Sequence, residues 1–194
     1  GNNIGGLIGK NSGTITLTND QTNTTKTISS SKGNSVGGII GYNTSLGHIQ
    51  VLSGTNDVIA VNNQVTITGN QQIGGIVGSN DGNIGTPTQS NYLVSQAKLI
   101  QSSNGEAGGI VGHTSGSIYK AKNSSIQVVS NTGNTGGITA NNTYLIDQCI
   151  NQGNVRSNNG YAGGISAVNT GTISNSQVIG NIEIYQIGEN EVGS

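Results

Sequence analysis

One short glycine-rich string recurs six times and constrains the fold of this chain more than any other feature. In its second copy it reads Val36-Gly37-Gly38-Ile39-Ile40-Gly41-Tyr42-Asn43. The glycine pairs that open the copies begin at Gly5, Gly37, Gly74, Gly108, Gly136 and Gly163. Steps of 27 to 37 residues are typical of solenoids, propellers and other repeat arrays. The spacing predicts one repeat module over residues 1–194.

An aliphatic residue follows the first glycine of each copy by two positions, and a small residue follows it by four. Side chains alternate between the two faces of a strand, so these positions should share one face. We expect that face to point inward and to form a core ladder. This core ladder consists of Leu7, Ile39, Ile76, Ile110, Ile138 and Ile165.

Asparagine occupies the sixth position after the first glycine in five of the six copies. These residues are Asn11, Asn43, Asn80, Asn142 and Asn169, with Thr114 in the fourth copy. Asparagine tolerates the left-handed backbone geometry of a turn, and stacked asparagines can form hydrogen bonds with one another. We expect a turn at this column, with an asparagine ladder running from coil to coil.

Further short strands should follow each turn. A second aliphatic column begins at Ile15 and Ile49 and continues through Ile84, Ile118, Ile146 and Ile173; third strands are expected near residues 57–61, 65–68, 125–129 and 178–184. A single coil cannot bury its aliphatic face, so the coils must stack in parallel. The prediction is an all-β, right-handed parallel β-solenoid of about six coils, each with two or three short strands. A propeller is disfavoured because its blades need about 40 residues.

If the core ladder faces inward, the residues on either side of it in the same strand should face outward. These are Ile4, Ile8, Val36, Ile40, Ile73, Val77 and Val111. Soluble monomers rarely expose an apolar stripe of that length. The pattern therefore predicts a face for self-association, or for contact with a partner or a neighbouring segment of the same parent protein.

Composition argues against most enzymatic and nucleic-acid functions. Charged residues make up 8% of the chain and the net charge is −1, so no basic stripe exists to bind nucleic acid. The few carboxylates are dispersed, and neither histidine has neighbours at metal-ligand spacing, so we expect no catalytic group, no metal and no cofactor. No apolar run is long enough to span a membrane. Cys149 aligns with Ala121 and Ser176, which predicts a buried filler of the core.

Four Asn-x-Ser/Thr sequons offer N-glycan acceptors if the chain passes through a eukaryotic secretory route. They lie at Asn23, Asn43, Asn123 and Asn141.

The string Gly-Gly-Ile-Val-Gly-x-Asn-x-Gly-x-Ile, present at residues 74–84 and with Thr114 for asparagine at 108–118, resembles the GLUG motif. The similarity spans almost the whole chain, although the last two copies carry Thr139-Ala140 and Ser166-Ala167 within the motif. The resemblance implies a β-helical stalk or adhesive module that is secreted or attached to a cell surface, and it implies no reaction. The chain starts without Met, and neither end shows a cap. We therefore expect an internal segment of a longer solenoid, or a subunit that stacks end to end.

The leading hypothesis is a non-enzymatic extracellular structural or adhesive module, either the shaft of an adhesin or the subunit of a filament. The alternative is a carbohydrate-binding adhesin domain that uses Tyr42, Tyr92, Tyr119 and Tyr144 as stacking platforms. A polysaccharide-active enzyme is less favoured because no carboxylates pair in the sequence. An ice-binding protein is less favoured because the Thr-x-Thr strings do not recur at one column.

Overall fold

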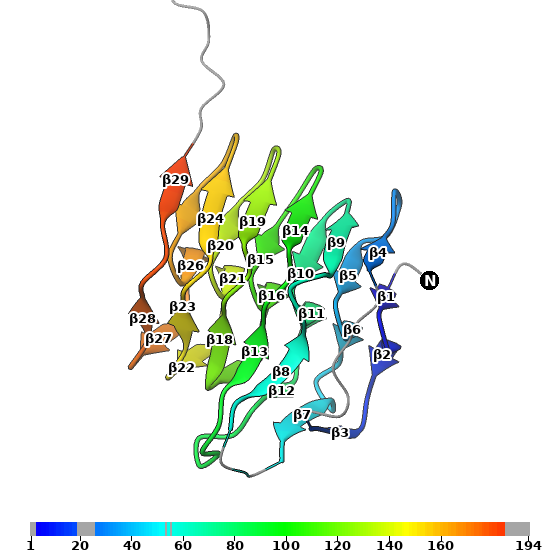
Figure 1. Ribbon diagram of the computed structural model, residues 1–194, viewed down its shortest axis with the longest axis vertical. Coiled ribbons are helices and arrows are strands. Elements are labelled where there is room, and N and C mark those ends of the chain that lie inside the picture. Colours follow the sequence, from blue (N-terminus) through cyan, green and yellow to red (C-terminus); the bar gives the residue numbers. More distant parts are fainter. Residues whose placement is uncertain (1–2, 19–25, 53, 55, 185–194) are drawn as a thin grey trace, which may run out of the picture.

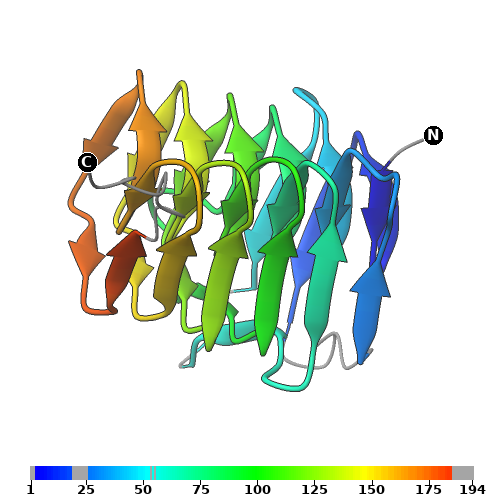
Figure 2. The ribbon, with the colours of Figure 1, turned by 90° about the horizontal axis from the view of Figure 1, so that it is seen from above.

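The computed structural model describes residues 3–18, 26–52, 54 and 56–184, and over these residues the protein is a parallel β-solenoid without helices. The chain winds through successive coils that lie side by side along one axis (Figure 1). Seen from above, equivalent strands line up as parallel rows (Figure 2). The predicted fold class is confirmed.

Five sheets run along the solenoid, and all their strand pairings are parallel. Sheet A contains β1 (Asn3–Gly5), β5 (Ser35–Gly37), β10 (Gln72–Gly74), β15 (Ala107–Gly108), β20 (Thr135–Gly136) and β25 (Ala162–Gly163). Sheet B contains β2 (Ile8–Asn11), β6 (Ile40–Asn43), β11 (Val77–Asn80), β16 (Val111–Thr114), β21 (Thr139–Asn142) and β26 (Ser166–Asn169).

The other three sheets complete each coil. Sheet C contains β3 (Thr14–Leu17), β7 (His48–Val51), β12 (Asn83–Ile84), β17 (Ser117–Tyr119), β22 (Leu145–Asp147) and β27 (Thr172–Ser174). Sheet D contains β8 (Val58–Val61), β13 (Leu93–Ser95), β18 (Ala121–Asn123), β23 (Ile150–Asn151) and β28 (Gln177–Val178). Sheet E contains β4 (Thr27–Ser29), β9 (Thr66–Gly69), β14 (Leu99–Ser102), β19 (Gln127–Ser130), β24 (Asn154–Ser157) and β29 (Ile182–Ile184).

We number the coils 1 to 6 by their glycine pairs. Within the described part of the chain, each coil from 2 to 6 contributes one strand to every sheet, so the expected two or three strands per coil was too low. The strands are only two to four residues long, and bends between them split what the sequence pattern presents as longer runs.

Stacked aliphatic columns fill the interior. In sheet C the second aliphatic column pairs in register from Ile15 to Ile173, as the sequence predicted. In sheet E, Ile28, Ile67 and Ile100 stack in the same way. Full burial of one such side chain stabilises the fold by about 1.5–3 kcal/mol relative to exposure, so these columns hold neighbouring coils together.

The core ladder is buried in the interior coils. Ile39, Ile76, Ile110 and Ile138 are each 0% exposed. The expectation was wrong for Leu7, which is 55% exposed, and Ile165 is only partly buried. Both belong to the end coils, where a neighbouring coil is described on one side only.

The chain bends after the first glycine of each pair, so the recurring glycine-rich string forms two strands and not one. A prediction based on side chains alternating along a single strand does not include this bend. The bend at Gly38 and Ile39 separates β5 from β6. A Cβ on Gly37 would lie 2.0 Å from the carbonyl oxygen of Ile40 and 2.7 Å from the amide of Gly78, so only glycine fits where the chain turns back.

The predicted outer stripe therefore lies inside the protein. Its interior members Val36, Ile40, Ile73, Val77 and Val111 are all 0% exposed. Ile4 and Ile8, in the first coil, are partly buried and pack against the same core. The prediction of a self-association or partner face on these residues was wrong, because the bend resets the alternation of side chains between sheets A and B.

Left-handed backbone geometry also occurs at a different corner from the one expected. In the described residues, positive φ angles occur at Gly85, Lys120, Gln148 and Asn175. Each lies between a strand of sheet C and the following strand of sheet D. The asparagine column at the end of the sheet B strands does not adopt this conformation, and its members Asn11, Asn43, Asn80 and Asn142 are buried instead.

Candidate functional site

The asparagine ladder is a buried chain of side-chain hydrogen bonds at the end of sheet B. Asn11 Nδ2 donates to Asn43 Oδ1 at 2.8 Å, and Asn43 Nδ2 donates to Asn80 Oδ1 at 2.7 Å. Asn80 Nδ2 then donates to Thr114 Oγ1 at 3.0 Å. Asn43 and Asn80 are fully buried, so water cannot reach their side-chain amides. The ladder bonds satisfy the hydrogen-bonding groups of these amides instead.

Thr114 divides the ladder. The single proton of its hydroxyl can be donated to the backbone carbonyl of Gly116, at 3.0 Å, or to that of Asn80, at 3.3 Å, and is not donated toward the next coil. The ladder resumes where Asn142 Nδ2 donates to Asn169 Oδ1 at 2.7 Å. The ladder serves structure, since its interior amides are closed to any ligand.

Burial excludes glycan attachment at two of the four sequons in the folded protein. Asn43 and Asn123 are 0% exposed, and the Nδ2 atom of each donates a buried hydrogen bond. The prediction of glycans there was wrong because this fold has no room for a sugar on either amide. Asn141 is partly exposed and donates to Glu106, whereas Asn23 lies outside the described residues.

From coil 2 onward, each strand of sheet B comes close to the sheet A strand of the preceding coil. We call the outward-facing angle between these two sheets the notch. Glycines line its base: a Cβ on Gly41 would lie 2.5 Å from the Ile4 amide, and one on Gly112 would lie 2.6 Å from the Ile73 amide. The small residues that the sequence placed in the core thus bring the two sheets together on the outside. The rims of this notch carry polar side chains.

In coils 4 and 5 the two rims are joined by side chains. His113 Nδ1 lies 3.2 Å from Glu106 Oε2, and Asn141 Nδ2 donates to the other oxygen of the same carboxylate. The hydrogen bond with Glu106 raises the pKa of His113, an effect that outweighs the opposing effect of burial. The imidazolium form is therefore favoured by the folded protein.

Stability should fall slightly as pH rises past the titration of His113. A raised folded-state pKa gives stability that is fully present below the unfolded value of about 6.5 and is lost as pH rises through the folded value. We expect a decrease of about 0.5–1 kcal/mol in the free energy of unfolding between pH 6 and pH 8.5. Urea titrations at a series of pH values measure it. The variant His113→Gln should lack this decrease, and an unchanged profile in that variant would contradict the assignment.

In coils 1 to 3 the notch remains open as a hollow of about 500 Å³. Its lining includes Tyr42, Gln72, Ser79 and Asp81. Tyr42 Oη donates to Asp81 Oδ2 at 2.5 Å, and this bond raises the pKa of the tyrosine hydroxyl. Of the four tyrosines considered as stacking platforms, Tyr42 is the one in this hollow.

The remaining tyrosines are dispersed. Tyr92 lies under the Nζ of Lys122, which is 5.3 Å from the ring centroid and forms an ion pair with Asp57. Burial alone would raise the pKa of Asp57, but hydrogen bonds from Lys122 and from the Tyr92 amide outweigh burial and lower it. Tyr144 is exposed, as is Tyr161, which was not among the predicted stacking platforms.

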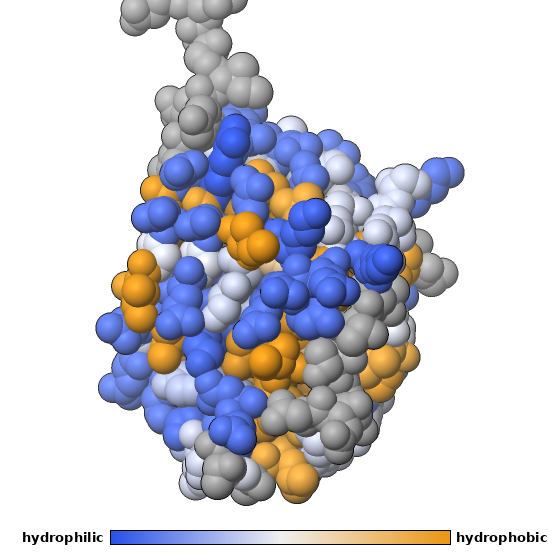
Figure 3. Space-filling model, in the orientation of Figure 1, coloured by the Kyte–Doolittle hydropathy of each residue, from blue (hydrophilic) through white to orange (hydrophobic). Residues whose placement is uncertain are grey.

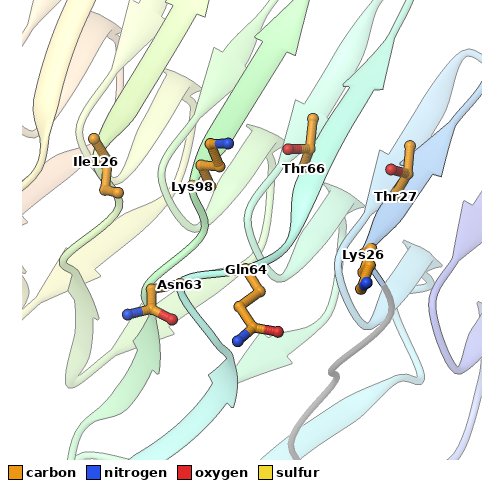
Figure 4. A pocket seen from close by; sticks show the side chains of 7 residues that line it. All are labelled: Lys26, Thr27, Asn63, Gln64, Thr66, Lys98 and Ile126. Atoms are coloured by element: carbon orange, nitrogen blue, oxygen red, sulfur yellow. The ribbon is translucent and has the colours of Figure 1, made fainter.

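A larger hollow, of about 690 Å³, lies over the start of sheet E. Figure 4 shows its side chains spread over neighbouring coils, with Thr27, Thr66 and Lys98 in a row and Asn63 and Gln64 on a connecting loop. Lys26 and Ile126 complete the lining. These groups do not point to a common centre, so the hollow lacks the convergence of a formed site.

The part of the chain that the structure describes holds no metal cluster, and the face drawn in Figure 3 is mostly hydrophilic. No group of three or more His, Cys, Asp or Glu residues gathers in the part of the chain that the structure describes. Figure 3 shows a face dominated by hydrophilic residues, with separate hydrophobic patches. Among the described residues, no helix has the length and hydropathy needed to cross a membrane.

Cys149 is buried directly before β23 of sheet D, at the register position between Ala121 and Ser176, as the sequence predicted. Its Sγ donates to the carbonyl oxygen of Asp147 at 3.4 Å. Burial raises the pKa of the thiol to about 12. Because the thiolate is the reactive form, the folded protein should have an unreactive cysteine.

We expect Cys149 to resist alkylation by iodoacetamide at pH 8, where roughly one thiol in 10⁴ would be ionised at that pKa. In 8 M urea the same thiol should react at the rate of a free cysteine. Mass spectrometry of the two samples measures the difference. Rapid labelling of the folded protein would show that sheet D opens locally.

Searches of family models, curated proteins and solved structures find no match to this chain.

Proposed function

We propose that this protein is a non-enzymatic extracellular structural module, a β-solenoid shaft of the kind that its resemblance to the GLUG motif implies. The observation that supports this most is the in-register stacking of all five sheets through the described coils. Buried aliphatic columns join successive coils in sheets C and E, and the described acidic residues are dispersed or engaged in hydrogen bonds. A chain built in this way is suited to maintaining length and stiffness outside the cell.

The two end coils suggest how such a shaft extends. Ile173 is 38% exposed in coil 6, whereas its partner Ile146 in coil 5 is fully buried. Coil 1 and coil 6 carry the same residue types at equivalent positions of these columns. Ile173 of coil 6 is equivalent to Ile15 of coil 1, and Asn169 is equivalent to Asn11. We propose that coil 6 of one copy stacks on coil 1 of the next, head to tail, which is a contact that generates fibres.

Association is tested by sedimentation velocity and negative-stain electron microscopy over a range of concentrations. Wild-type protein should form rods that lengthen as concentration rises. Ile173→Lys places a charge in the end column and should abolish this growth, whereas Tyr144→Lys, on an exposed residue of coil 5, should not. Single modules at every concentration, or unchanged rods in Ile173→Lys, would refute the proposal.

A further inference from the structure

The open part of the notch in coils 1 to 3 has the features of a ligand site. Its lining is polar: Asn3, Ser35 and Gln72 lie in sheet A, with Asn34 directly before β5, whereas Tyr42 and Ser79 lie in sheet B and Asp81 directly follows β11. Most of these side chains are partly or largely buried, so they hold defined positions. Ser35 Oγ donates to Gln72 Oε1 at 3.0 Å, which fixes one wall.

The hollow exists because one column changes size along the solenoid. In sheet B, Tyr42, Ser79 and His113 are in register on successive strands. The longer side chains of this column find partners beyond their own strand: His113 meets Glu106 next to sheet A, and Tyr42 extends to Asp81 of the next coil. Serine is too short to do so, and space is left beside the ring of Tyr42.

The second wall is held by a carboxylate. Asp81 accepts hydrogen bonds from Tyr42 Oη and, at 2.7 Å, from Ser115 Oγ. A carboxylate has capacity for about four hydrogen bonds, so these two donors leave Asp81 able to accept further bonds from a ligand. Bonds from hydroxyl groups to an ionised carboxylate are about twice as strong as bonds between neutral groups.

The chemistry of this lining restricts the ligand. No Lys or Arg lines the hollow, and its single charge is negative, which disfavours phosphate, sulfate and carboxylate ligands. One carboxylate does not provide the several oxygen ligands that Ca²⁺ requires. Amides, hydroxyls and one aromatic ring suit a neutral polyhydroxylated molecule, whose apolar ring face can pack on Tyr42.

A peptide fits this place less well. Extended peptides usually bind by adding a strand to a free sheet edge. Here β5 pairs with β1 and β10, and β6 pairs with β2 and β11, so neither strand has a free edge. The hollow therefore offers side-chain groups, and not a strand edge, for hydrogen bonding to a ligand.

We propose that the hollow beside Ser79 binds a neutral oligosaccharide, with Tyr42 as the stacking platform and Asp81 and Gln72 as hydrogen-bonding groups. This site does not depend on end-to-end assembly, because Tyr42, Gln72 and Asp81 lie in coils 2 and 3 and not in an end coil. A shaft that carries it would bind glycans along its side.

Saturation-transfer-difference NMR with maltotriose, cellotriose and N,N′,N″-triacetylchitotriose tests the proposal. At least one of the three should show saturable transfer. Ser79→Gln, which fills the hollow with a longer side chain in a column that already accommodates Tyr42 and His113, should weaken that binding at least tenfold. Ser90→Gln makes the same change on an exposed loop and should leave binding unaltered.

Two results would overturn the site: absence of saturable binding by all three sugars, or wild-type binding in Ser79→Gln. Circular dichroism checks that each variant is folded. If Ser79→Gln does not fold, Tyr42→Ala takes its place, since loss of the ring should reduce binding to the same extent. Loss of rods in Ile173→Lys with binding retained would separate this proposal from that of assembly.

Discussion

Replacing Gly74 by alanine should destabilise the solenoid by about 3 kcal/mol or more. A Cβ there would lie 1.9 Å from the carbonyl oxygen of Val77 and 2.8 Å from that of Ile110. Both obstacles are backbone atoms, so relief requires the bend between β10 and β11 to open. That movement separates sheets A and B and disturbs the buried columns on either side of the bend.

The matched control is Gly13→Ala, at a glycine whose added Cβ would meet nothing within 4 Å. Its effect should lie within about 0.5 kcal/mol of zero. Urea-induced unfolding followed by circular dichroism gives both values. Equal stability of Gly74→Ala and Gly13→Ala would show that the tight bend is not required.

The second large effect should come from Asn43→Leu, which interrupts the asparagine ladder in the core. Leucine has a similar size but leaves Asn80 Oδ1 without its donor and removes the acceptor of Asn11 Nδ2. Each buried polar group left unsatisfied costs about 1–3 kcal/mol. We expect a loss of about 2–5 kcal/mol in the free energy of unfolding.

Asn43→Thr provides the comparison, because threonine occupies the same column at position 114. Thr114 Oγ1 accepts from Asn80 and donates to a backbone carbonyl, so a threonine at 43 should satisfy part of the ladder. Its loss should be less than half that of Asn43→Leu in the same urea titration. If leucine proves no worse than threonine, the ladder contributes packing and not hydrogen bonds.

The repeat and the register of the stack could be predicted from the sequence, because they rest on period and on side-chain type. Ile15 to Ile173 form one column in the structure, and Cys149 sits in the small column with Ala121. Equivalent residues of successive coils stack on one another and share the same environment. The residue type that recurs at a column therefore predicts whether that column is buried.

Side-chain direction around the glycine pair could not be predicted in the same way. Alternation holds within a strand, and the run from Val36 to Ile40 reads as one strand. The turn at Gly38 places Val36 and Ile40 on the inside and moves Gly37 and Gly41 toward the notch. The close backbone approaches that require glycine at these positions appear only when neighbouring coils are in place.

The hollow beside Ser79 was missed for a related reason. It depends on sheets A and B facing each other across the notch, and a linear sequence does not bring Gln72 and Tyr42 together. The available signal was Ser79 itself, a small residue where adjacent repeats have Tyr42 and His113. This difference in side-chain size predicts a hollow only when the column is known to lie on the outer rim of the notch.

The asparagine ladder also gives the solenoid a polarity. At each asparagine link the earlier coil supplies the N–H group and the later coil supplies the oxygen, so the amide dipoles align along the axis. A second copy arriving head to tail would let Asn169 donate to Asn11 and lengthen this aligned series. Two copies meeting coil 6 to coil 6 would instead set donor against donor. The proposed head-to-tail contact would therefore continue the donor-to-acceptor order that exists inside one module.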